Sequence, residues 1–188
     1  MINIQTSFHR SNDSADDAGM VVGLLDRFPE LAALAVHPAE GAIVLTFAVQ
    51  GRLEQRYERG LVDLITEHVV ALLSVNRDTV GILKIGFEHD KRMSFVRVRR
   101  DVRSFSRAEL VMLTALLSTR FGERLVRSPQ EDPPSDEDRM DLDELVDFAI
   151  EALRTPASPR SMVGFREDRG VLVYYLKTGK GAKARARR

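Results

Sequence analysis

The sequence predicts an α+β fold in which antiparallel β-hairpins pack against amphipathic helices. Two patterns alternate along the chain. Apolar residues recur every three or four positions, as on a buried helix face, and short β-branched runs then flank turn residues, as in hairpins. The composition, 44% apolar and 30% charged, is that of a globular chain, and 188 residues suffice for one main domain with a small appendage. Helix–hairpin units of this kind bury one helix face on one sheet face.

The first helix is predicted over residues 14–28, where four apolar side chains have helical spacing: Val21, Leu24, Leu25 and Phe28. Pro29 ends it. Residues 31–49 then form two apolar runs around a turn at Pro38–Gly41, which predicts a hairpin. These runs are almost continuously apolar, so we expect both faces of the two strands to be covered.

A long second helix is predicted over residues 53–73, with an apolar stripe formed by Tyr57, Leu61, Leu64, Ile65, His68 and Leu72. A second hairpin follows, with its turn at residues 89–92 and with Ile85 paired with Val96. Because side chains alternate along a strand, this pairing separates two faces. The apolar face carries Leu83, Ile85, Phe87, Val96 and Val98. The other face carries Lys84, Gly86, Phe95, Arg97 and Arg99.

Ser106 and Glu109 have the spacing of a capping box and predict a third helix, whose buried stripe is Leu110, Leu113, Thr114, Leu117 and Phe121. We interpret residues 1–127 as the main α+β domain. Residues 128–140 combine three prolines with clustered acids and predict an acidic linker. Residues 141–177 predict a C-terminal helix–hairpin unit. Residues 178–188 predict a basic, flexible tail, because they contain no large apolar side chain.

Within the C-terminal unit, "MDLDELVDFAIEAL" followed by "FREDRGVLVYY" resembles the helix and hairpin at the end of the long bacterial ribosome hibernation-promoting factors. The similar positions are Met140, Asp141, Phe165, Arg166, Gly170, Val173 and Tyr174. Residues 79–127 have no counterpart in that family. The resemblance is therefore confined to one short unit and assigns the chain to no family.

The formal net charge is zero, so no general attraction to polyanions follows from the total. This zero is a cancellation between segments. Residues 131–147 contain nine acids and one base, whereas residues 91–107 contain seven bases and one acid. The chain has no cysteine, which suits a reducing compartment. It also lacks the apolar segment of a signal peptide or membrane span, so we expect a cytoplasmic protein without a membrane partner.

The catalytic motifs that can be recognised by spacing are missing from the sequence. It contains no phosphate-binding glycine loop, no H-E-x-x-H and no G-x-S-x-G. Its histidines, His9, His37, His68 and His89, are scattered, and we interpret His89 as a solvated turn residue. We therefore predict no catalytic residue, no cofactor and no metal site, and we lean against an enzyme. An enzyme whose residues meet only in the folded chain stays as the third alternative.

The best candidate for a site is the basic strand of the second hairpin. Its predicted nucleic-acid-binding residues are Lys84, Phe95, Arg97, Arg99, Arg100 and Arg103. Basic side chains attract phosphates, and a base can stack on an aromatic ring. The same residues also fit an ordinary solvated sheet face, on which arginines protect an exposed strand from aggregation.

The leading hypothesis is therefore a non-enzymatic binding or regulatory protein that contacts nucleic acid, RNA in preference to DNA. The alternative is a protein-interaction or assembly module. Such a module would form homo-oligomers through apolar surface that the short unit at residues 141–176 leaves unburied.

Overall fold

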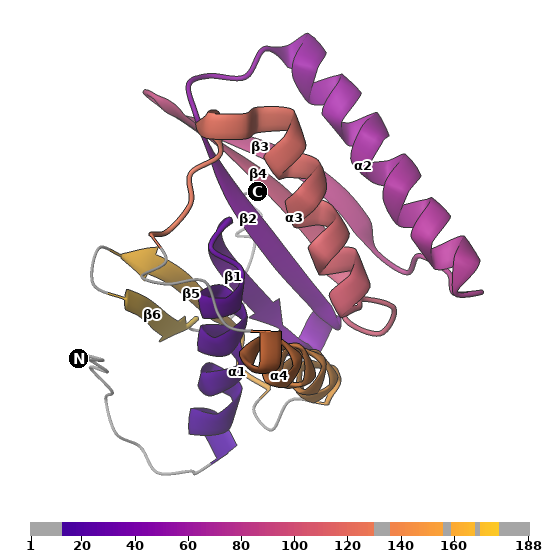
Figure 1. Ribbon diagram of the computed structural model, residues 1–188, viewed down its shortest axis with the longest axis vertical. Coiled ribbons are helices and arrows are strands. Elements are labelled where there is room, and N and C mark those ends of the chain that lie inside the picture. Colours follow the sequence, from indigo (N-terminus) through magenta and orange to yellow (C-terminus); the bar gives the residue numbers. More distant parts are fainter. Residues whose placement is uncertain (1–12, 130–135, 156–158, 168–169, 177–188) are drawn as a thin grey trace, which may run out of the picture.

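A computed structural model of the chain describes residues 13–129, 136–155, 159–167 and 170–176, and it confirms the predicted α+β class (Figure 1). Its helices are α1 (Asp13–Arg27), α2 (Gln55–Val75), α3 (Arg107–Phe121) and α4 (Asp136–Arg154), with short 3₁₀ turns η1 (Pro38–Glu40) and η2 (Gly122–Arg124). Its strands are β1 (Leu31–His37), β2 (Ala42–Gln50), β3 (Leu83–Asp90), β4 (Met93–Asp101), β5 (Met162–Glu167) and β6 (Gly170–Tyr175).

The described strands form one antiparallel sheet in the order β3-β4-β2-β1-β5-β6. Three hairpins lie side by side in it, and a helix precedes each of them: α1 before β1–β2, α2 before β3–β4, and α4 before β5–β6. α4 packs against α1, and β5 pairs with β1, so the C-terminal unit extends the sheet of its own chain. The division into a main domain and a C-terminal unit stays a prediction, since both parts share this sheet.

Local sequence features fix the ends and the contacts of these elements. Gly41 closes the turn of the first hairpin in the left-handed region, at φ 56°, where glycine is favoured. The Ser106 side chain caps α3 as predicted, because it accepts a hydrogen bond from the Glu109 N–H at 3.3 Å. Gly164 lets α1 approach β5, since a Cβ at this position would lie 2.4 Å from Val21 Cγ1.

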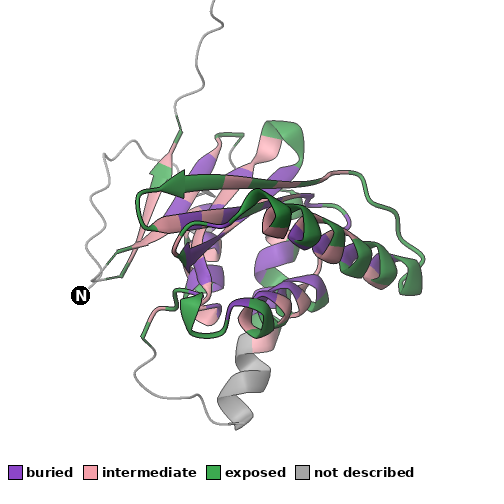
Figure 2. Ribbon diagram, turned by 90° about the horizontal axis from the view of Figure 1, so that it is seen from above, coloured by how far each residue is buried: buried purple, intermediate pink, exposed green. Residues whose placement is uncertain are grey.

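In the described part of the chain, the helices all lie on one face of the sheet (Figure 2). α1 packs over β1, β5 and β6, while α2 and α3 lie over the half of the sheet that contains β3 (Figure 1). The core fills the space between the two layers and includes Leu25, Leu34, Leu45, Val98 and Leu113. The described residues put no helix on the opposite face. The prediction that β1 and β2 are covered on both faces is therefore wrong for this part of the chain.

Two boundaries differ from the prediction. Ile85 pairs with Val98, not with Val96, and the turn is confined to Lys91 and Arg92. The shift is by two residues, so every side chain keeps its predicted face. α4 begins at Asp136, inside the predicted linker at residues 128–140. Residues 130–135 of that linker and the predicted tail at 178–188 lie outside the described residues.

Candidate interaction surface

The uncovered face is a grid of side chains that the strand register defines. One row crosses the sheet from β3 to β6 through Lys84, Arg99, Val44, Ala35, Val163 and Tyr174. The next row crosses it through Gly86, Arg97, Thr46, Ala33, Phe165 and Leu172. The face is therefore charged over β3 and β4 and mainly apolar over β1, β5 and β6. In a water-exposed antiparallel sheet the outward positions are usually polar, so the apolar half is unusual.

An open hollow of about 660 Å³ lies on this face. Its lining includes small side chains of β1, Ala33 and Ala35, and the rings of Phe95 on β4 and Phe165 on β5. Phe165 stacks on Tyr174 of β6, with ring centroids 5.5 Å apart and an interplanar angle of 6°. Tyr174 keeps 52% of its surface exposed. The lining also includes Glu88, Arg97 and Arg166, so the hollow suits an apolar group of a binding partner that is flanked by polar groups.

Four of the six predicted site residues lie on this face, as predicted: Lys84, Phe95, Arg97 and Arg99. Their cross-strand neighbours differ from those expected, because the register is shifted. Phe95 lies opposite Glu88, and Arg97 lies opposite Gly86. Phe95 therefore does not lie opposite Gly86, as pairing of Ile85 with Val96 would require, and it contributes to the lining of the hollow.

Two of these arginines are already paired with carboxylates. Arg97 forms an ion pair with Glu88 of β3, and Arg99 forms one with Glu40 in η1. Exposed pairs of this kind contribute only about 0–1 kcal/mol to stability. The pairs also matter for binding, because each carboxylate offsets a positive charge that would otherwise attract phosphate. The face therefore carries a weaker positive field than the sequence alone indicates.

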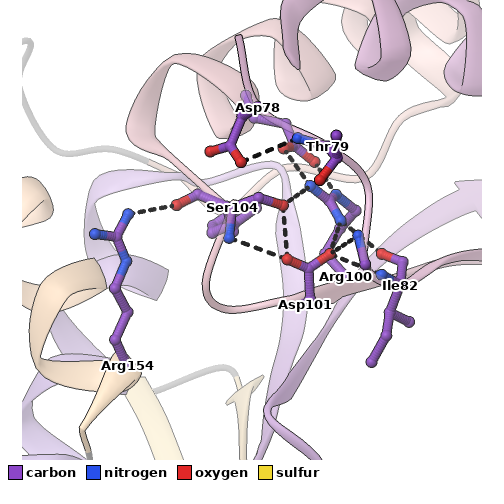
Figure 3. Close-up of polar contacts among 10 residues, drawn as sticks. Asp78, Thr79, Ile82, Arg100, Asp101, Ser104 and Arg154 are labelled. Atoms are coloured by element: carbon purple, nitrogen blue, oxygen red, sulfur yellow. Dashed lines mark hydrogen bonds and ion pairs between the residues drawn. The ribbon is translucent and has the colours of Figure 1, made fainter. Parts of the chain in front are cut away.

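Arg100 is buried, which corrects its prediction as a nucleic-acid-binding residue. Its side chain is 0% exposed and points toward the helices. Nε donates to Glu109 Oε1 at 2.5 Å, and Nη1 donates to Asp101 Oδ1 and to the Ile82 carbonyl, each at 2.5 Å. Nη2 donates to Ser104 Oγ at 3.0 Å. The guanidinium is thus enclosed by partners of its own chain (Figure 3).

The charges in this cluster depend on one another. Burial alone raises the pKa of Asp101, but the hydrogen bonds from Ser104, from the Ile82 N–H and from Arg100 outweigh it, so the pKa lies well below its usual range. For Glu109 burial dominates over the Arg100 pair, and its pKa is raised. Burial alone lowers the pKa of Arg100, yet the two carboxylates raise it overall. This cluster stabilises the end of β4 and its loops and offers no binding surface.

The remaining basic residues of this stretch do not join the open face. Arg103 is exposed in the turn after β4, beyond the strand ladder. Arg107 at the start of α3 pairs with two acids of α4: Nη1 with Asp143 at 2.7 Å and Nε with Asp147 at 3.0 Å. The predicted basic block is therefore divided between an open sheet face, a buried cluster and a helix–helix contact.

The prediction of His89 as a solvated turn residue is right about its exposure but wrong about the turn. His89 lies on β3, where Nε2 is 2.8 Å from a Glu58 carboxylate oxygen and Nδ1 is 3.0 Å from Ser94 Oγ. This order resembles a nucleophile, base and carboxylate, but Ser94 is fully buried. Its hydroxyl also lies 2.9 Å from the Gly51 carbonyl and accepts from the Leu53 N–H at 3.0 Å. The trio fastens the loop before α2 to the sheet.

Sequence reasoning missed Ala33, Ala35 and Val44 of the apolar half, whereas Val163, Phe165 and Tyr174 lie in the unit at residues 141–176 for which an apolar interaction surface was the alternative hypothesis. One signal was available, because the runs in β1 and β2 are apolar at consecutive positions. That pattern predicts cover on both faces of the strands without indicating what supplies it. The structure instead leaves the second side of the hairpin open in the described residues.

Within the described ranges, these features define an α+β protein whose helices cover one sheet face and whose other face carries a hollow lined by apolar and charged side chains. Among the described residues, no group of three or more acidic or histidine side chains could hold a metal ion, and no helix is long and apolar enough to span a membrane. Comparison with protein-family models, with curated proteins and with solved structures finds no match.

Proposed function

We propose that the chain is a protein-interaction module that binds through the open face of its sheet. One observation carries the proposal: β1 and β2 have the sequence of strands buried on both faces, yet the described chain covers only one of them. A contiguous apolar surface on a folded chain favours a protein interface. The cover that the sequence implies would then come from another polypeptide.

The charges on the face support a protein partner over a polyanion. Arg97 and Arg99 are offset by Glu88 and Glu40, so the face has charges of both signs beside an apolar half. Protein interfaces combine an apolar core with a polar rim. Nucleic-acid sites depend on unpaired positive charge. The cysteine-free composition keeps the cytoplasm as the proposed location.

Nucleic-acid binding stays the second candidate, because Lys84, Phe95, Arg97 and Arg99 share the open face. RNA and DNA titrations at two salt concentrations test it with three proteins: the full chain, an Arg97→Ala/Arg99→Ala variant and a chain ending at Lys177. If this candidate is right, the double variant lowers the salt dependence by about two phosphate contacts. Equal and negligible binding by all three proteins would eliminate it.

Site-specific photo-crosslinking in cells that contain the protein tests the leading proposal. A photoreactive residue replaces Val44 on the open face or, as a matched control, Val70 on α2, which is 45% exposed. With the photoreactive residue at position 44 we expect discrete crosslinked adducts that protease treatment removes. With the residue at position 70 we expect few adducts. Adducts that nuclease removes would support the second candidate. Equal labelling at both positions would contradict an interface on this face.

A further inference from the structure

The identity of the partner follows from the size, shape and charge of the open face, if that face is a protein interface as proposed above. We propose that the partner is a second copy of this chain. The two copies would pack their sheets face to face, so that each open face covers the other and the apolar half of each becomes buried. The contact would be isologous, with each copy contributing the same surface.

The size of the sheet fits a stable dimer. Six strands about 4.8 Å apart span about 24 Å, and strands of six to nine residues at about 3.3 Å per residue span about 20–30 Å. The face therefore covers on the order of 500–700 Å². A standard protein interface buries about 800 Å² on each partner, so the whole face, and not its apolar half alone, is needed to approach that size. A second sheet of equal size covers the whole face, whereas a single helix or extended peptide would leave much of it open.

The shape of the face is complementary to itself. Two sheets that pack face to face lie about 10 Å apart and need their side chains to interdigitate. Each copy supplies a hollow with alanines in its lining and, beside it, the stacked rings of Phe165 and Tyr174. In an isologous contact the rings of one copy can enter the hollow of the other, and the reverse contact forms at the same time.

The charges on the face do not oppose such a dimer. A strongly basic face would repel its own copy, because like charges across an interface are costly. Here Glu88 and Glu40 neutralise Arg97 and Arg99 within each copy. These pairs lie over β3, β4 and η1, on one side of the apolar half. The Arg97–Glu88 pair lines the hollow, and together the two pairs form a polar border along one side of the contact.

Sedimentation equilibrium of the purified, nuclease-treated full chain tests this inference. We expect a monomer–dimer equilibrium in the wild-type protein. Val44→Asp should weaken the dimer at least about a hundredfold, because an isologous interface then buries two added carboxylates, each beside an Arg99 whose charge Glu40 already offsets. Val70→Asp on α2 is the matched control and should leave the dissociation constant unchanged, and far-UV circular dichroism checks that both variants fold.

A second measurement introduces no charge into the apolar surface. The chain has no cysteine, so Thr46→Cys gives a single spin-label site beside the hollow. Two sheets about 10 Å apart and about 24 Å wide would place the labels of the two copies less than about 35 Å apart. The same label at Val70→Cys, on a helix behind the sheet, should give a longer distance.

Three outcomes would overturn the inference: a monomer at all concentrations, a dimer that Val44→Asp and Val70→Asp affect equally, or a shorter label distance at position 70 than at position 46. A monomer that still gives protease-sensitive adducts at position 44 in cells would refute only the second copy as partner. The interaction module would then bind a different protein. A monomer that gives no protease-sensitive adducts at position 44 would refute the proposed function as well.

Discussion

Replacing Arg100 with methionine would show what the buried charge cluster contributes to stability. Arg100→Met keeps most of the apolar stem but removes the guanidinium that faces Glu109 and Asp101. Glu109 is 0% exposed, so its carboxylate would stay buried without its cation. Removing one partner of a buried ion pair costs about 3–5 kcal/mol. At about 2–4 °C per kcal/mol for a chain of this size, the melting temperature should fall by roughly 6–20 °C.

Urea denaturation followed by circular dichroism measures this loss directly. The matched control is Arg100→Met/Glu109→Leu, which removes both charges, and we expect it to recover most of the lost stability because an apolar pair can replace a buried ion pair. The reasoning is refuted if Arg100→Met costs less than about 1 kcal/mol, below the usual cost of an unpaired buried charge. It is also refuted if the double variant is no more stable than the single one.

The pH dependence of this variant has a definite sign. The pKa of Glu109 is raised by burial, so the folded state binds its proton more readily than the unfolded state does. Protonated Glu109 therefore contributes to the stability of the folded state at low pH, and this contribution is lost as the pH rises through the raised pKa. Without Arg100 the pKa should rise further. The penalty of Arg100→Met should therefore be smaller near pH 4.5, close to the ordinary value of glutamate at about 4.3, than at pH 7.

Three further substitutions test other parts of the fold. Gly164→Ala should destabilise the protein by about 1–3 kcal/mol, since the new methyl overlaps Val21, and hydrogen exchange should increase most in β5 and β6. Asp101→Asn should reduce the loss of unfolding free energy that the wild-type protein shows as the pH falls from 7 to 2. The lowered pKa of Asp101 gives stability above the ordinary value of about 3.9 that is lost as the pH falls, and urea midpoints from pH 2 to 7 measure it. Ser106→Ala removes the cap on the Glu109 N–H and should cost about 1 kcal/mol in the same urea assay, whereas Ser106→Asp should restore it.

Much of the fold follows from sequence patterns, since each helix and hairpin has its own periodicity. The four apolar residues predicted to anchor the first helix, Val21, Leu24, Leu25 and Phe28, are all buried. The order of the strands does not follow in the same way, because pairing between β1 and β5 depends on edges that are far apart in the chain. The register of the second hairpin was displaced by two residues, since alternation fixes the face of a side chain but not its neighbour.

The candidate site was only partly predictable. Alternation correctly placed Lys84, Phe95, Arg97 and Arg99 on one face. The same rule places Arg100 on the buried side with Val98, but its carboxylate partner, Glu109, lies on another element. Charge partners that lie far apart in the chain leave no mark in the local pattern, so the pairing of Arg99 with Glu40 was also missed.

The open face also depends on tertiary structure. Apolar runs in β1 and β2 show that these strands require cover, but they do not show which molecule supplies it. Only the placement of the helices on one side of the sheet reveals that the described chain covers one face (Figure 2). The aromatic pair on the open face likewise requires β5 and β6 to dock beside β1.

The central claim is that another polypeptide covers the open sheet face, and thiol alkylation in cells tests it most directly. Thr46→Cys places a single thiol at the hollow of a chain without native cysteine, and adding Val44→Asp would open the interface. We predict that the double variant is alkylated at least about tenfold faster, as expected if the face is occupied more than about 90% of the time. A nearby carboxylate alone slows alkylation because it disfavours the thiolate, so it cannot produce this increase. Equal rates in the two variants would show that nothing covers the face and would contradict the account.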